Sequence, residues 1–105
     1  MKILLDENLP RNLKADFGSD FEVKTVRDMK WLGKKNGELL GLITLNGFDF
    51  FITIDKNLRH QQNLAKFNLT VFLLIASDNR RETLQKLAEK IKVRIKNIEI
   101  GRAHV

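Results

Sequence analysis

The strongest constraint on the fold of this chain is the alternation of short apolar runs with segments of helical periodicity. Such runs lie at Lys2–Leu5, Phe50–Ile54 and Thr70–Ile75. A continuous apolar run of this length is typical of a strand buried on both faces of a parallel sheet. Residues 21–25 instead alternate apolar and charged side chains, which predicts a half-exposed strand near an edge. The pattern therefore predicts an α/β fold whose mainly parallel sheet has four or five strands.

Helices are predicted between and after these strands. Asn8 is expected to cap the first helix, with Pro10 in its first turn and Gly18 at its end. Asn36 is expected to cap the second, which Asn46 and Gly47 end. A short third helix is predicted for residues 57–65. The inward-facing positions of the first two helices are Leu9, Leu13, Phe17, Leu39, Leu40 and Ile43.

The last helix is predicted to follow a capping box formed by Asn79 and Glu82. After it, Ile98 and Ile100 are expected to form the fifth strand, at an edge of the sheet. The apolar stripe of this helix consists of Leu84, Leu87, Ala88, Ile91 and Ile95.

Length and composition exclude several classes of protein. The 105 residues suit one domain with its own core, and 43% hydrophobic with 30% charged residues excludes a disordered chain. The absence of cysteine excludes disulfides, thiolate zinc sites and cysteine nucleophiles. The longest apolar run, residues 71–76, is too short for a membrane span, and the N-terminus does not resemble a signal peptide. We therefore expect a cytoplasmic protein that does not enter the membrane.

The basic excess of the chain lies at its C-terminal end. Of the net charge of +6, residues 80–105 contribute eight basic against three acidic residues. A localised basic surface can attract phosphate backbones, but it is equally compatible with a solvated helix face.

Acidic residues follow two of the predicted strands. Asp6 and Glu7 follow the first strand, Asp55 follows the central strand, and Glu38 lies in the first turn of the second helix. In a parallel sheet the carboxyl ends of the strands meet at one edge, so these groups are expected to converge. Crowded carboxylates must bind a cation or a proton, and oxygen-only ligands favour Mg²⁺ or Mn²⁺. The structural alternative is that they are turn residues, or acids favoured by a helix dipole.

Four blocks of the sequence resemble a family of small, stand-alone bacterial PIN-like proteins. They are LLDENLPRNL, Trp31-Leu32-Gly33 with KNGELL, FITIDKNLRHQQNL, and Ser77-Asp78-Asn79-Arg80. The resemblance covers nearly the whole chain and implies a single PIN-like domain over residues 1–105. The implied fold is a three-layer α/β/α sandwich with a mainly parallel sheet. The family is related to VapC-type toxins, which are metal-dependent ribonucleases.

The resemblance also implies roles for individual residues. Asp6 and Asp55 match the acids of the PIN pattern, and Glu38 is the third candidate for metal binding and catalysis. Asn36 stands where many relatives carry aspartate, which is a departure from the pattern. In a metal-dependent nuclease, Glu7 is expected to support the metal ligands, and Asn8, Asn36 and Asn57 are expected to orient ligands or substrate. Because they lie close in sequence to the site blocks, the residues expected to contact phosphate are Arg11, Lys56, Arg59 and Arg80.

Three functions follow from these observations. The first is a Mg²⁺- or Mn²⁺-dependent endoribonuclease that hydrolyses RNA phosphodiesters, acting as the toxin of a toxin–antitoxin pair. Its partners would be RNA, a small antitoxin protein and a second copy of the chain. The second is a PIN-like binding module that has lost catalysis and acts through a protein partner or RNA. The third is a phospho-acceptor receiver domain, which also carries acids after its first strand and an aspartate after a central strand. Against it, a receiver domain needs a lysine after its last strand, usually before proline, and the only proline of this sequence is Pro10.

Overall fold

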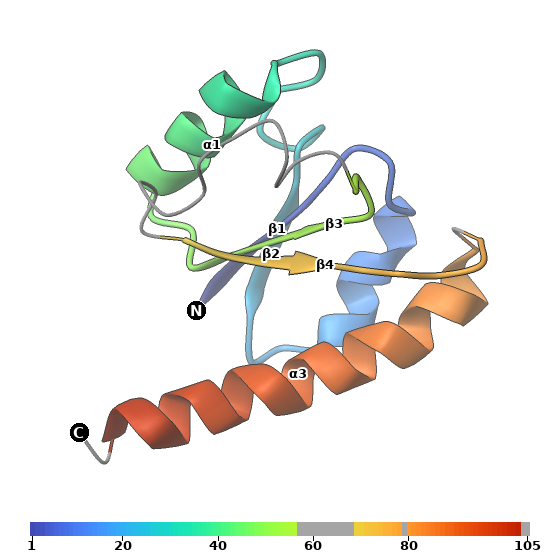
Figure 1. Ribbon diagram of the computed structural model, residues 1–105, viewed down its shortest axis with the longest axis vertical. Coiled ribbons are helices and arrows are strands. Elements are labelled where there is room, and N and C mark those ends of the chain that lie inside the picture. Colours follow the sequence, from blue (N-terminus) through green and yellow to red (C-terminus); the bar gives the residue numbers. More distant parts are fainter. Residues whose placement is uncertain (57–68, 79, 104–105) are drawn as a thin grey trace.

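The computed structural model describes residues 1–56, 69–78 and 80–103, and the side chains within these ranges except those of Asn36 and residues 99–103. Four parallel strands form one sheet in the order β2-β1-β3-β4 (Figure 1). The strands are β1 (Lys2–Leu5), β2 (Glu22–Thr25), β3 (Phe50–Thr53) and β4 (Thr70–Leu73). The predicted α/β class and parallel sheet are therefore confirmed, with β2 at an edge as its alternating sequence indicates.

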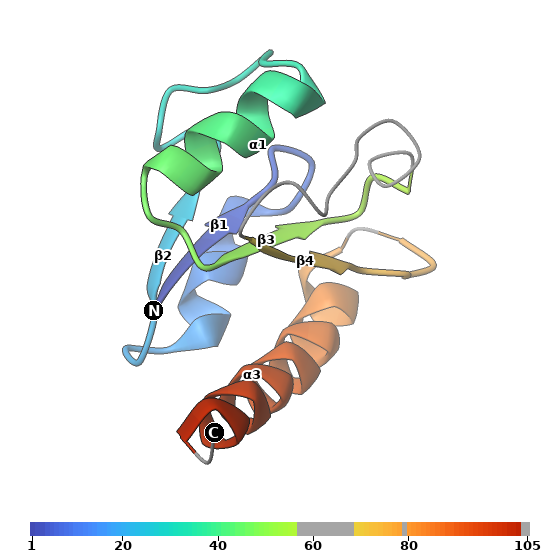
Figure 2. The same ribbon diagram turned by 60° about the vertical axis from the view of Figure 1, so that its left-hand side comes forward.

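Helices cover both faces of the sheet, which explains the continuous apolar runs. On one face, Leu4 of β1 and Phe51 of β3 pack against helix α1 (Asn36–Leu45). On the other face, Ile3 and Ile52 pack against the 3-10 helix η1 (Arg11–Phe17) and helix α3 (Arg81–Ala103). Because consecutive strand residues point to opposite faces, a strand covered on both must be apolar at every position. Figure 2 shows α1 on one side of the sheet and α3 with η1 on the other.

The predicted start of the first helix is wrong. Asn8 does not cap it; the helix begins at Arg11 with Pro10 at the N-cap position, and it is a 3-10 helix. A residue that precedes proline is disfavoured in the helical conformation, so Leu9 blocks a helix starting at Asn8. Leu9 instead closes a turn by donating its N–H to the Asp6 carbonyl at 3.1 Å. Gly18 ends the helix as expected, with a left-handed φ of 75°.

Asn36 is likewise not a cap. It is the first residue of α1, and Lys35 occupies the N-cap position in an extended conformation, without a side-chain capping bond. Leu39, Leu40 and Ile43 of this helix are buried, as predicted.

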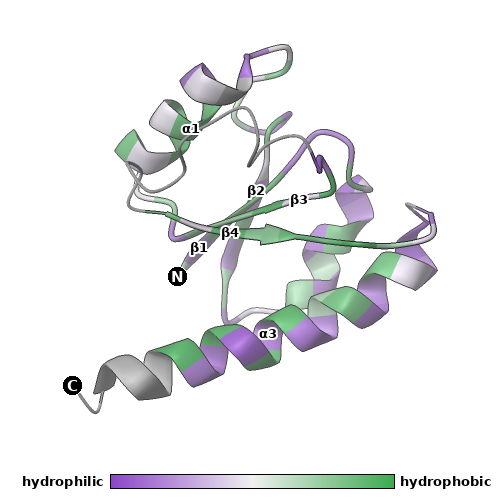
Figure 3. Ribbon diagram, in the orientation of Figure 1, coloured by the Kyte–Doolittle hydropathy of each residue, from purple (hydrophilic) through white to green (hydrophobic). Residues whose placement is uncertain are grey.

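The predicted fifth strand is also wrong. Ile98 and Ile100 lie in α3, which continues to Ala103, and the described residues contain no fifth strand. No proline or glycine interrupts the chain between Ile95 and Ile100, and Ile98 continues the apolar stripe by packing against the same core cluster. Figure 3 shows that apolar and polar residues alternate along α3. The helix predicted for residues 57–65 and the Asn79 cap lie outside the described residues.

Candidate functional site

Asp6 and Asp55 lie at the carboxyl ends of two neighbouring strands. Leu5 of β1 is in register with Ile52 of β3, and the Asp6 N–H donates to the Ile52 carbonyl at 3.0 Å. The hydroxyl of Thr53, which has no exposed surface, donates to Asp6 Oδ2 at 2.5 Å. The same hydroxyl oxygen accepts the backbone N–H of Asp55 at 3.0 Å. One buried hydroxyl therefore connects the Asp6 carboxylate to the Asp55 backbone, and we call these three residues the Asp6–Thr53–Asp55 cluster.

The surroundings of Asp6 act against its ionised form. Burial raises the pKa of Asp6 above its ordinary value, and the nearby carboxylates of Glu7 and Asp55 raise it further. Hydrogen bonds from the Thr53 hydroxyl and from the Glu7 N–H, 2.8 Å from Asp6 Oδ1, lower the same pKa but do not cancel the increase. A positive charge bound beside Asp6 would remove both causes of the increase, because it would replace lost hydration and offset the neighbouring carboxylates.

The other expected ligand, Glu38, is engaged elsewhere. Its carboxylate, on the first turn of α1, lies 3.1 Å from Lys34 Nζ and is 56% exposed. Within the described part of the chain, no group of three or more histidine or acidic side chains is arranged to hold a metal ion. The oxygen-bearing side chains of the cluster are two carboxylates and one hydroxyl.

Five of the remaining predicted site residues, Glu7, Asn8, Arg11, Lys56 and Arg80, have described side chains. Glu7 and Asn8 are exposed in the turn after β1, and Lys56 is exposed shortly after β3. Arg80 is exposed just before α3, where its N–H donates to Asp78 Oδ1 at 2.9 Å. Nothing is described for the Asn36 side chain, and Asn57 and Arg59 lie outside the described residues.

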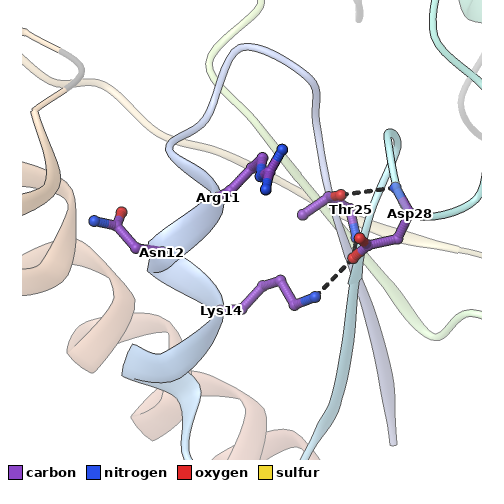
Figure 4. A pocket seen from close by; sticks show the side chains of 5 residues that line it. All are labelled: Arg11, Asn12, Lys14, Thr25 and Asp28. Atoms are coloured by element: carbon purple, nitrogen blue, oxygen red, sulfur yellow. Dashed lines mark hydrogen bonds and ion pairs between the residues drawn. The ribbon is translucent and has the colours of Figure 1, made fainter.

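Arg11 lines a surface pocket of about 620 Å³, together with Asn12, Lys14, Thr25 and Asp28 (Figure 4). Thr25 ends β2 in register with Leu5, so the pocket adjoins the strand end that carries Asp6. Lys14 Nζ lies 2.7 Å from Asp28 Oδ2, and this contact lowers the pKa of Asp28. The Arg11 side chain extends toward Thr25 and Asp28 from η1. Of these five residues, the sequence pattern predicts only Arg11 as a site residue.

The segment after β2 forms the far wall of this pocket through a capped turn. Asp28 Oδ2 accepts the Thr25 N–H at 2.9 Å, and the Thr25 hydroxyl accepts the Asp28 N–H at 3.0 Å. This is the reciprocal bonding of a capping box, and the Thr-x-x-Asp spacing could have revealed it. The turn ends at Lys30, whose φ is 63°, with Trp31 N–H donating to the Val26 carbonyl and Lys30 N–H to the Arg27 carbonyl. These two bonds form a Schellman motif, in which glycine is the usual residue at the Lys30 position.

A second ion pair joins η1 to α3 and was not predicted. Arg81 donates through Nε and Nη2 to the two carboxylate oxygens of Asp16, at 3.3 and 3.1 Å. The Asp16 side chain is only 4% exposed, whereas that of Arg81 is 41% exposed. No local pattern marks this pair because its members are separated by most of the chain. It aligns the start of α3 with η1, which carries Arg11.

Three comparisons with known proteins find no match: no protein-family model, curated protein or solved structure is similar to this chain at a significant level. In the part of the chain that the structure describes, no helix combines the length and apolar character needed to cross a bilayer. The geometry of the Asp6–Thr53–Asp55 cluster and its surroundings is therefore the basis for inferring a function.

Proposed function

We propose that this chain is a PIN-like, Mg²⁺- or Mn²⁺-dependent endoribonuclease. The observation that carries the proposal is the Asp6–Thr53–Asp55 cluster, in which the Thr53 hydroxyl bonds both the Asp6 carboxylate and the Asp55 backbone. Two acidic residues from distant parts of the sequence thereby come together at the carboxyl edge of a parallel sheet. Ligands of open α/β sheets bind at this edge. The arrangement of helices on both faces supports the finer proposal of a three-layer α/β/α sandwich.

The donor atoms of the cluster fit a hard divalent cation. Mg²⁺ is commonly bound through one or two carboxylates, with water and substrate phosphate completing its coordination. Asp6 and Asp55 would hold the ion, and Glu38 would join after exchanging its contact with Lys34. When bound, such an ion activates water and stabilises negative charge on a phosphoryl oxygen. Thr53 keeps Asp6 oriented and favours its ionised form, which is the form that binds a cation.

The cationic groups near the cluster favour a nucleic acid as substrate. Arg11 lines the adjoining pocket. Lys56 is exposed after the end of β3, and Arg80 is exposed just before the start of α3. Guanidinium and ammonium groups position phosphates without reading base sequence. We propose that they hold the backbone of single-stranded RNA in the cytoplasm. By resemblance, the nuclease would act as a toxin restrained by a small antitoxin protein, and a second copy of the chain is a further proposed partner.

A binding module without catalysis is the second candidate. The observation in its favour is that Glu38 pairs with Lys34 and that the described residues contain no three-ligand group. Such a module would retain the fold and the cationic surface but would bind divalent ions weakly.

Cleavage and ion binding separate the two candidates. The protein is incubated with single-stranded RNA and Mn²⁺ or Mg²⁺, beside a variant that combines Asp6→Asn with Asp55→Asn. Asp20→Asn, an exposed aspartate in the turn before β2, is the matched control. We expect metal-dependent cleavage by the wild type and Asp20→Asn, and loss of cleavage in the double variant. Equal cleavage by all three proteins would refute the nuclease, and calorimetry without detectable ion binding would favour the binding module.

A further inference from the structure

The outer side of β4 presents backbone groups that pair with no described strand. Thr70 and Leu74 donate their N–H groups to the Asp49 and Thr53 carbonyls, at 3.3 and 2.8 Å, toward β3. Since consecutive residues of a strand direct their N–H and C=O groups to opposite sides, those of Val71 and Leu73 point away from β3. No described segment pairs with that side, because β4 ends the sheet. An exposed edge of this kind is a template for another strand.

An apolar groove of about 420 Å³ lies along this edge, between β4 and α3. Figures 1 and 3 show β4 at the margin of the sheet, with α3 running beneath it. The floor of the groove combines Phe72 and Leu74 with the apolar stripe of α3, which is formed there by Leu87, Ile91 and Ile98. Just beyond β4, Ile75 leaves 73% of its surface exposed. The groove can therefore take apolar side chains from a strand added to β4.

Two basic residues of α3 line the groove. Lys90 and Arg94 are both exposed, and neither forms an ion pair with any described residue. The surrounding C-terminal region, residues 80–105, carries eight basic and three acidic residues. A second copy of the chain would bring the same positive charge to this groove, so charge repulsion disfavours it as the occupant. An acidic occupant would be attracted.

We propose that the β4 edge and the groove beside it bind an acidic segment of a partner protein as an added strand. The backbone of the segment would pair with Val71 and Leu73, its alternate apolar side chains would contact Leu87 and Ile91, and its carboxylates would pair with Lys90 and Arg94. A peptide is favoured over RNA because proteins that bind single-stranded nucleic acid typically stack its bases on exposed aromatic side chains. Phe72, the aromatic residue of the groove, is half-buried against Phe50, with ring centroids 5.7 Å apart. This proposal does not rest on the proposed ribonuclease activity.

The test uses the full chain and a fluorescein-labelled peptide, Asp-Glu-Val-Thr-Val-Thr-Val-Glu-Asp, with fluorescence anisotropy as the readout. A variant combining Lys90→Glu with Arg94→Glu is compared with one combining Lys86→Glu with Lys96→Glu, which makes the same charge change on α3 outside the groove. We expect the first variant to weaken binding by about tenfold or more and the second to weaken it much less, because close charge pairs contribute more than distant ones.

Backbone pairing is tested separately. N-methylation of the peptide at alternate residues removes the hydrogen-bond donors along one edge of the added strand, and methylation of the set that faces β4 should abolish binding. Amide hydrogen exchange followed by NMR should slow at Val71 and Leu73 on peptide addition, and stay unchanged at Thr70 and Leu74, which already donate to β3. The proposal is overturned if the peptide does not bind, if both α3 variants bind equally, or if Val71 and Leu73 gain no protection. Displacement of the peptide by a single-stranded RNA that also loses affinity in the Lys90→Glu, Arg94→Glu variant would reassign the groove to nucleic acid.

Discussion

Replacing Thr53 with valine isolates the hydroxyl that connects Asp6 to Asp55. Thr53 has no exposed surface, and valine has nearly the same shape, so packing is largely preserved. The substitution removes the hydrogen bond to the Asp6 carboxylate and leaves the Asp55 N–H without its acceptor. A hydrogen bond to a charged group contributes about 1.5–3 kcal/mol, and the orphaned N–H adds about 1 kcal/mol. The extra buried methyl returns about 1 kcal/mol, so we expect a net loss of about 2 kcal/mol at neutral pH.

The loss should depend on pH in a direction that the site defines. The Thr53 hydroxyl lowers the pKa of Asp6 because it stabilises the ionised carboxylate, so its removal is most costly when Asp6 is ionised. Burial keeps the overall pKa of Asp6 above its ordinary value of 3.8. Below that pH Asp6 is protonated, and the penalty should fall to about 1 kcal/mol, the contribution of a neutral hydrogen bond.

Urea unfolding at neutral and at acidic pH measures this difference. Thr53→Ser is the matched control, because it keeps the hydroxyl and removes only a methyl group, which costs about 1 kcal/mol at either pH. An equal loss of unfolding free energy in Thr53→Val at both pH values would contradict this role of the hydroxyl. So would a loss equal to that of Thr53→Ser at both pH values.

Three further predictions concern stability. Lys30→Gly should raise the free energy of unfolding by about 1 kcal/mol, since relief of the left-handed strain at this position of the Schellman motif exceeds the added freedom of the unfolded chain. A lower free energy of unfolding, measured with urea, would contradict this prediction. Arg81→Met should lower it by about 2 kcal/mol, because the nearly buried Asp16 carboxylate loses both donors. Adding Asp16→Asn to Arg81→Met should recover part of this loss, and no recovery would mean that Arg81 acts through packing. Because the pKa of Asp6 is raised, its ionisation opposes folding, so wild-type stability should decline as pH rises through the titration of Asp6. Asp6→Asn should flatten that decline in thermal melts, and an unchanged slope would show that another group causes it.

Part of the candidate site could be predicted from local signals. Asp6 and Asp55 were found because each follows an apolar run, and parallel strands bring such positions to one edge. Thr53 was missed because a single hydroxyl inside the run FITI does not disturb the strand pattern. The Asp16–Arg81 pair was missed for another reason. It joins η1 to α3 across 65 positions, and no short-range spacing encodes a contact over that separation.

The errors in the fold come from competition between local preferences. Asn8 is a good capping residue, but Pro10 two positions later restricts Leu9 and moves the helix start to Arg11. The apolar residues Ile98 and Ile100 are spaced by two, as in a strand. In the tertiary structure Ile98 continues the buried stripe of α3, and packing against the sheet keeps this stretch helical.

From the sequence alone one can derive the α/β class, the four strands and the apolar faces of the helices, because burial on one or both faces leaves a period that can be counted along the chain. The strand order β2-β1-β3-β4 is set only in the tertiary structure, since it depends on which distant segments pair. That order puts the Asp6 strand beside the Thr53 strand and leaves β4 with one neighbour among the described residues. Both the Asp6–Thr53–Asp55 cluster and the groove beside β4 therefore follow from long-range strand pairing. Such pairing stabilises the fold only after the entropy cost of closing the loop between the paired strands has been met.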